Sequence, residues 1–168
     1  LRMPDQRTKS GRRNLSILSL MYDTAARVQE IADLTPAMVH LAKPGTIRLI
    51  GKGKKVRIVP LMDKQVEILK RYMIENKLTE PYANQYPLFS NNRNEKLTRA
   101  GIGYILNKYV KMARTEGPSL IPSKFSCHCM RHSKAMHMLQ SGVNLVYIRD
   151  MLGHVSVQTT EIYARADS

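Results

Sequence analysis

Residues in the last quarter of the sequence combine groups that could act on a phosphate. His128 and Arg131 stand three positions apart, and on a helix this spacing puts an imidazole and a guanidinium on one face, where both can address the same anion. The run Leu152-Gly153-His154 is typical of a helix end, because glycine is favoured just past a C-cap. Ser156 could cap a last short helix that carries Tyr163. The pattern therefore predicts three polar groups that converge with a phenol.

These residues resemble the catalytic domains of the tyrosine recombinases, also called phage-type integrases. The family motifs His-x-x-Arg-His and Leu-Gly-His, followed by a tyrosine, match residues 128–132, residues 152–154 and Tyr163. Upstream, residues 24–31 look like the first arginine box of the family, with Ala-Ala where it normally has glycine and a larger apolar residue, and residues 51–60 look like its lysine hairpin. The resemblance covers nearly the whole chain, and four boxes in this order make it specific.

Breaking a phosphodiester without a metal requires a nucleophile, positive charge on the non-bridging oxygens and a proton donor for the leaving oxygen. Arg27 and Arg131 can each offer a planar fork of donors to a phosphate. Tyr163 would attack phosphorus, and His128 is the candidate base, since an unperturbed phenol is a poor nucleophile at neutral pH. The resemblance implies that Lys52 donates the proton. It also implies that His154 binds the phosphate or buttresses the site.

The function that the resemblance implies is site-specific cutting and rejoining of double-stranded DNA through a 3′-phosphotyrosine intermediate. We expect a recombinase or integrase of a bacterial mobile element rather than an enzyme of chromosome-dimer resolution. Two alternatives stay open: a type IB topoisomerase, and an integrase-derived DNA-binding regulator without activity. The six candidate catalytic residues are Arg27, Lys52, His128, Arg131, His154 and Tyr163.

The composition favours a nucleic-acid partner. The 168 residues hold 27 Lys plus Arg against 13 Asp plus Glu, a formal net charge of +14, which is far more than solubility requires. Because the tip of the predicted hairpin is strongly basic, we expect it to bind in a groove of DNA. Residues 1–13 look like a flexible basic segment that could lie along DNA. The candidate DNA-binding residues are Lys54, Lys55 and Arg57 in the hairpin and Arg12 and Arg13 in the N-terminal segment.

A zinc site built from Cys127, His128, Cys129, His132 and His137 is the competing chemistry. Structural zinc uses paired ligands within loops and a second pair farther on, whereas two cysteines two apart on a helix point to different sides. We therefore predict no metal and no cofactor. The two cysteines are also badly placed for a disulfide, and no secretory signal or membrane span is evident, so we expect a cytoplasmic, nucleoid-associated protein.

The predicted fold is α+β and mainly helical, with a small antiparallel sheet, as in tyrosine recombinase catalytic domains. Apolar residues at helical spacing predict two helices over residues 14–34 with a break at residues 24–26, and further helices at 63–76, 98–114, 127–140 and 143–152. Residues 46–50 and 56–59 predict a hairpin. We expect one domain, residues 1–168, without the family's N-terminal core-binding domain. The resemblance implies a homotetramer on DNA for the full-length protein, and this fragment alone could be a monomer.

Overall fold

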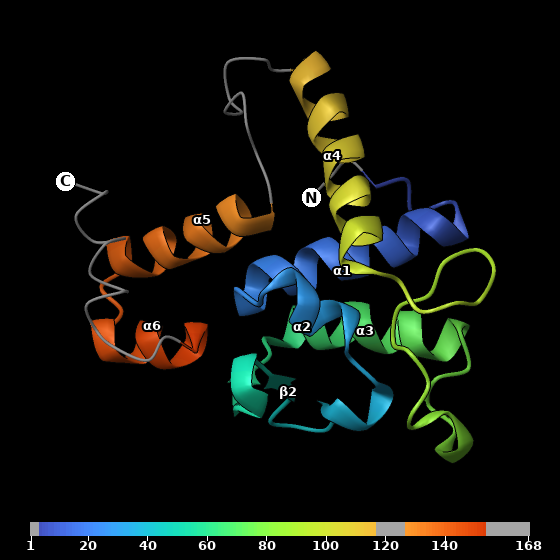
Figure 1. The fold of residues 1–168 in the computed structure, drawn as a ribbon, viewed down its shortest axis with the longest axis horizontal. Coiled ribbons are helices and arrows are strands. Elements are labelled where there is room, and N and C mark those ends of the chain that lie inside the picture. Colours follow the sequence, from blue (N-terminus) through green and yellow to red (C-terminus); the bar gives the residue numbers. More distant parts are fainter. Residues whose placement is uncertain (1–3, 117–126, 154–168) are drawn as a thin grey trace.

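The structure is a computed structural model that describes residues 4–116 and 127–153, with residues 116, 127 and 128 described by their backbone only. Helices dominate it, and three strands form one antiparallel sheet in the order β1-β2-β3 (Figure 1). This confirms the predicted fold class. The helices are α1 (Lys9–Thr24), α2 (Val28–Ala32), α3 (Asp63–Glu75), α4 (Arg99–Glu116), α5 (Cys127–Gln140) and α6 (Leu145–Leu152), and the strands are β1 (Val39–His40), β2 (Thr46–Ile50) and β3 (Val56–Pro60).

Helix α1 begins earlier than the sequence indicated. The Thr8 hydroxyl accepts a hydrogen bond from the Gly11 N–H at 2.9 Å, which caps the helix at a residue inside the predicted flexible segment. Gly11 lies inside the helix and close to the Asp5 carbonyl. A Cβ at this position would be 1.7 Å from the carbonyl oxygen, so only glycine fits here. The prediction of a flexible segment is therefore wrong for residues 9–13, which are helical.

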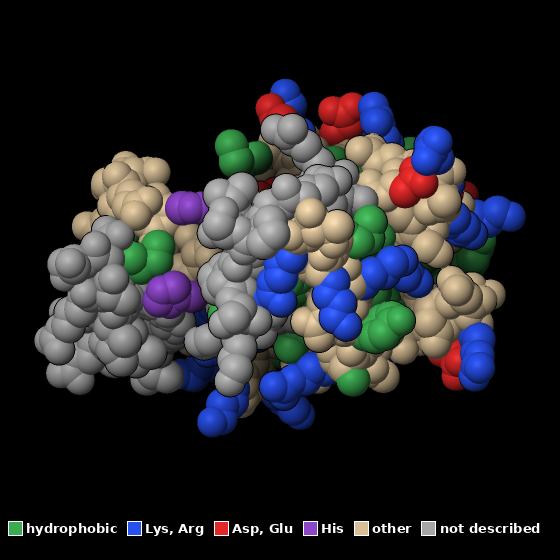
Figure 2. All heavy atoms as spheres, turned by 90° about the horizontal axis from the view of Figure 1, so that it is seen from above, with side chains coloured by type: hydrophobic (Ala, Val, Ile, Leu, Met, Phe, Trp, Pro, Cys, Tyr) green, Lys and Arg blue, Asp and Glu red, His purple; other side chains and the backbone are tan. Residues whose placement is uncertain are grey.

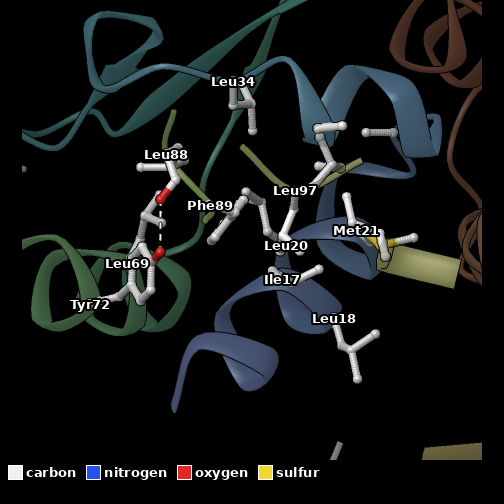
Figure 3. Packing of buried hydrophobic residues seen from close by; sticks show 14 of the residues in the cluster. Ile17, Leu18, Leu20, Met21, Leu34, Leu69, Tyr72, Leu88, Phe89 and Leu97 are labelled. Carbon is white, nitrogen blue, oxygen red and sulfur yellow. Dashed lines mark hydrogen bonds between the residues drawn. The ribbon is translucent and has the colours of Figure 1, made fainter. Parts of the chain in front are cut away.

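The main core lies where α1 and α3 pack together and the chain after α3 folds back over them. Figure 3 shows Ile17 and Leu20 of α1 near Phe89, with Leu69 of α3 close to Tyr72. All five side chains are buried. The Tyr72 hydroxyl donates to the Leu88 carbonyl at 2.7 Å, so this buried polar atom is satisfied. Because protein interiors are densely packed, this core holds the sheet and α1 in a fixed arrangement on which the site is built.

Helices α5 and α6 lie side by side at one end of the molecule, where α5 contacts α1 and α6 contacts β3 (Figure 1). A second, smaller apolar cluster joins them to the end of α1, and its buried members are Ala25, Ala135, Ile148 and Leu152. Because Ala25 directly follows α1, this cluster fixes the turn between α1 and α2 against both later helices.

The hairpin has the predicted strands and turn, and the structure adds a two-residue strand, β1, that the sequence did not indicate. In β2 and β3, Leu49 pairs with Arg57 and Ile47 with Val59. Side chains alternate between faces along a strand, so Arg57 lies on the inner face with Leu49 and Val59. No helix within the two described ranges is long and apolar enough to cross a lipid bilayer.

Candidate functional site

Arg27 stands in the turn between α1 and α2. Ala25 ends α1 in the left-handed conformation with φ 52°, and the chain leaves it extended, with Arg27 at φ −72° and ψ 149°. The Arg27 N–H donates to the Glu30 carboxylate at 2.7 Å. Glu30 therefore fixes the backbone of Arg27. Among the described residues, none forms a hydrogen bond with the Arg27 guanidinium, which leaves its donors available to a ligand.

Glu30 is the buried centre of this region. Its residue is 5% exposed, and its carboxylate forms a bidentate ion pair with Arg57 of β3. The Arg57 Nη2 donates to Oε1 at 2.8 Å and Nη1 donates to Oε2, while the Arg57 Nε donates to the Met151 carbonyl at 2.7 Å. One guanidinium thus connects α2, β3 and the last turn of α6.

Arg131 reaches the same helix end from α5. It is 5% exposed, and its Nη2 donates to the Leu152 carbonyl. The last carbonyls of a helix lack intrahelical donors and carry the negative end of the helix dipole, so cations are stabilised there. Gly153 closes the helix with φ 74°, as the sequence predicted. Two arginines from different elements therefore hold the end of α6, two residues before His154.

Lys52 begins the short turn Lys52–Lys54 at the hairpin tip, and its side chain is exposed. Gly51, directly before it, lies against the ion pair, since a Cβ on Gly51 would be 3.1 Å from the Glu30 Oε2 and 3.4 Å from the Arg57 Nη1. The base of the lysine turn is therefore packed on the buried carboxylate.

The structure brings the elements that carry three of the six candidate catalytic residues to one carboxylate. The Glu30 carboxylate accepts a hydrogen bond from the N–H of Arg27, and the positive charge of Arg131 lowers its pKa. The carboxylate also lies next to Gly51, the residue before Lys52. These three residues come from three separate elements. The other three candidates are outside what the structure describes: His128 by its side chain, and His154 and Tyr163 entirely.

The candidate DNA-binding residues lie in two places. Lys54 and Lys55 are exposed at the hairpin tip, next to Lys52. Arg12 and Arg13 lie in the first turns of α1, at the opposite end of that helix from the turn that holds Arg27. Arg12 pairs with Glu75 of α3 at 2.5 Å, and Arg13 donates to the Ser90 carbonyl at 3.1 Å.

Arg57, the fifth candidate, faces inward and is bonded within the protein, so its predicted contact with DNA has no support in this geometry. The alternation of β3 would have indicated this from the sequence, because Arg57 is two residues from the buried Val59. Figure 2 shows Lys and Arg side chains spread across one face of the molecule. Within the described ranges, no group of three or more His, Cys, Asp or Glu is placed to hold a metal ion.

Comparison with known proteins gives a consistent result. A model of the phage integrase family matches residues 3–168. The tyrosine recombinase XerC of Thermodesulfovibrio yellowstonii is 35% identical over 171 residues, which cover 98% of this chain and 54% of XerC. The tyrosine recombinase XerD of Staphylococcus epidermidis is 36% identical over 165 residues, which cover 97% of this chain and 53% of XerD. The chain thus spans about half the length of these relatives.

A solved structure is similar over the same extent. It is the XerH site-specific recombinase bound to its palindromic difH substrate in a post-cleavage complex, with a TM-score of 0.81 and 30% sequence identity. The match covers 98% of this chain and 45% of the XerH chain. The similarity therefore includes the helices and the hairpin that surround Glu30.

The Glu30 carboxyl links the site to the pH dependence of stability. Burial alone would raise the pKa of Glu30, but hydrogen bonds from Arg57 and from the Arg27 N–H, with the charges of Arg57 and Arg131, bring the pKa below its ordinary value. A carboxyl with a lowered pKa stabilises the fold above its unfolded-state pKa of about 4.3. That stabilisation is lost as the pH falls through the folded-state pKa.

We expect Glu30→Gln to lower the free energy of unfolding by about 3 kcal/mol at pH 7, because the substitution leaves a buried guanidinium unpaired. The difference from the unsubstituted chain should shrink as the pH falls through the lowered pKa of Glu30, because Glu30 itself then becomes neutral. Urea unfolding across this pH range measures both. Glu67→Gln, at an exposed pair with Arg71, is the control and should change stability by less than about 0.5 kcal/mol. A difference for Glu30→Gln that is the same at every pH would contradict the assignment.

Proposed function

This chain belongs to the phage integrase family, and we propose on that premise that its protein is a site-specific recombinase that cuts and rejoins double-stranded DNA through a 3′-phosphotyrosine intermediate. Identities of 35% and 36% to two tyrosine recombinases over almost the whole chain support this. The observation that carries the proposal is the gathering of Arg27, Arg131 and the Lys52 turn around Glu30. Topoisomerase activity and an inert DNA-binding role are the alternatives.

The two arginines would hold the scissile phosphate. Each guanidinium offers a planar pair of donors and stays charged at working pH, so together they would neutralise the charge that grows on the non-bridging oxygens in the transition state. Arg27 is held by its backbone, and Arg131 by its bond to the Leu152 carbonyl. The Arg131 guanidinium would therefore enter the reaction already oriented, whereas Arg27 would enter it with a fixed backbone and a guanidinium free to meet the phosphate.

Bond exchange would follow in one displacement. The Tyr163 oxygen forms a bond to phosphorus while the bond from phosphorus to the 5′ oxygen breaks, and His128 assists by taking the phenol proton. Lys52 gives a proton to the leaving 5′ oxygen, and His154 supports the phosphate. Because one phosphate ester replaces another, the bond energy is retained and no ATP is needed. Attack by a second 5′ hydroxyl on the phosphotyrosine reverses the step.

We propose further that the protein serves a bacterial mobile element and acts in the cytoplasm as a homotetramer on DNA, with an N-terminal core-binding domain beside this catalytic domain. The length of the relatives, about twice the part that this chain matches, is consistent with a second domain. The XerH complex shows that a similar protein is solved with its DNA substrate.

Tyr163→Phe in the full-length protein should abolish a covalent adduct with a nicked suicide duplex, because the phenol oxygen is the proposed nucleophile. The adduct is measured on a denaturing gel. Tyr147→Phe, at a tyrosine of α6 that is 47% exposed, is the matched control and should form adduct at the unsubstituted rate. The reaction should continue in EDTA.

An adduct that persists in Tyr163→Phe, or cleavage that stops in EDTA, would refute the proposed mechanism. Relaxation of a supercoiled plasmid that carries no recombination site would favour the topoisomerase alternative. Binding without any adduct would favour the inert regulator.

Replacing Lys54 and Lys55 together with alanine should weaken DNA binding most at low salt. Each lost phosphate contact should reduce the slope of log affinity against log salt by about 0.9. Titrations at several salt concentrations measure the slope. Lys70→Ala, at an exposed lysine of α3 without a predicted role, is the control. An unchanged slope in the double variant would show that the hairpin tip does not contact phosphates.

A further inference from the structure

We propose that Arg57 is a positioning residue for strand cleavage, which holds the Lys52 turn and the end of α6 in register with Arg27 and does not contact DNA. This inference rests on the proposed function, since it concerns the same site. The role of Arg57 would therefore differ from the phosphate contact that we predict for its basic neighbours Lys54 and Lys55.

The first argument is the number of bonds that one side chain makes. Nη1 and Nη2 of Arg57 bind the two oxygens of Glu30, and Nε binds the Met151 carbonyl. The bonded partners are distant from Arg57 in the chain, since Glu30 is 27 positions away and Met151 is 94 positions away. All three nitrogens lie in one rigid plane, so the guanidinium fixes the distance and the angle between α2 and α6, which a lysine ammonium cannot do.

The second argument is how closely the backbone approaches this pair. A Cβ on Gly153 would be 3.0 Å from the Arg57 Nη1, and one on Gly51 would be 3.4 Å from the same atom. The ion pair is therefore packed between two glycines. Gly51 directly precedes Lys52, and Gly153 directly precedes His154. Any shift of the Arg57 guanidinium would therefore displace the two glycines, each of which directly precedes a proposed catalytic residue in the sequence.

The third argument is the cost of using Arg57 otherwise. The side chains of Arg57 and Glu30 are 12% and 3% exposed. For Arg57 to bind a phosphate, its guanidinium would have to leave Glu30, and an unpaired carboxylate would remain buried close to the phosphate. An uncompensated buried charge is strongly destabilising. Holding the backbone is thus the role that is compatible with the observed pairing.

The experiment measures single-turnover cleavage of the suicide duplex by full-length Arg57→Met at saturating DNA. We expect a rate about 100-fold below that of the unsubstituted protein, the size of loss that a displacement of about 1 Å can cause. DNA affinity and its salt slope should stay unchanged. Arg57→Lys should not restore the rate. Arg48→Met is the matched control, because Arg48 is an exposed arginine of the neighbouring strand on the opposite face of the sheet, and it should cleave at the unsubstituted rate.

A second substrate separates positioning of Lys52 from a general loss of structure. It carries sulfur in place of the bridging 5′ oxygen, and a thiolate leaves without a proton because the pKa of a thiol, about 8.5, is far below that of an alcohol. If Arg57 positions the proton donor, Arg57→Met should recover most of its rate on this substrate. A defect of the same size on both substrates would overturn the inference.

The double variant Glu30→Gln with Arg57→Met covers the case in which Arg57→Met fails to fold, because it removes the buried carboxylate together with its partner. We expect it to show the same recovery on the sulfur substrate. A reduced salt slope in Arg57→Met would identify a phosphate contact and refute the inference, as would an unchanged cleavage rate. Failure of the unsubstituted protein to form any adduct would instead refute the proposed function.

Discussion

The buried ion pair between Glu30 and Arg57 is the interaction on which the arrangement of the site depends. The chain carries a formal net charge of +14, and a site that binds a phosphate must hold several cations close together before the phosphate arrives. Like charges at short range repel, most strongly away from water. A carboxylate that is 5% exposed, with Arg57, the Arg27 N–H and the charge of Arg131 around it, offsets that repulsion in the free protein and keeps the cations in place.

The same pair also helps to bring together residues that lie far apart in the chain. Arg27 follows α1, Lys52 lies at the hairpin tip, and Arg131 comes from α5, so no local rule of helix or strand geometry brings them together. The apolar cluster of Ala25, Ala135, Ile148 and Leu152 presses the α1–α2 turn against α5 and α6, but apolar packing is not directional. The guanidinium of Arg57 adds direction, because its hydrogen bonds to Glu30 and Met151 require fixed angles.

Much of the fold could be predicted from the sequence because its signals are local. The break after Thr24, the hairpin and the end of α6 at Gly153 follow from residue types within a few positions. The task of Arg57 could not be predicted in this way, since its partners are 27 and 94 residues distant. Strand alternation could have indicated only its inward direction. The strand β1 was missed because it is two residues long and exists only through its pairing with β2.

For the residues predicted to contact DNA, too, the local sequence does not reveal partners that are distant in the chain. Arg12 and Arg13 belong to a basic segment by composition, but their partners Glu75 and Ser90 are more than sixty residues away, so the sequence could not show that they connect α1 to α3 and to the loop before α4. Lys54 and Lys55 differ because a tight turn at a hairpin tip is exposed by its own geometry. For them the local sequence was sufficient to predict exposure.

The carboxyl of Glu30 reports the central interaction directly, and its carbon-13 resonance can be followed by NMR as the pH is lowered. With the ion pair intact, the midpoint of this titration should lie below the ordinary value of about 4.3, and in Arg57→Met it should move upward, because the hydrogen bonds and the charge of Arg57 no longer offset the effect of burial. A midpoint at or above the ordinary value in the unsubstituted protein, or one that Arg57→Met leaves in place, would contradict the account.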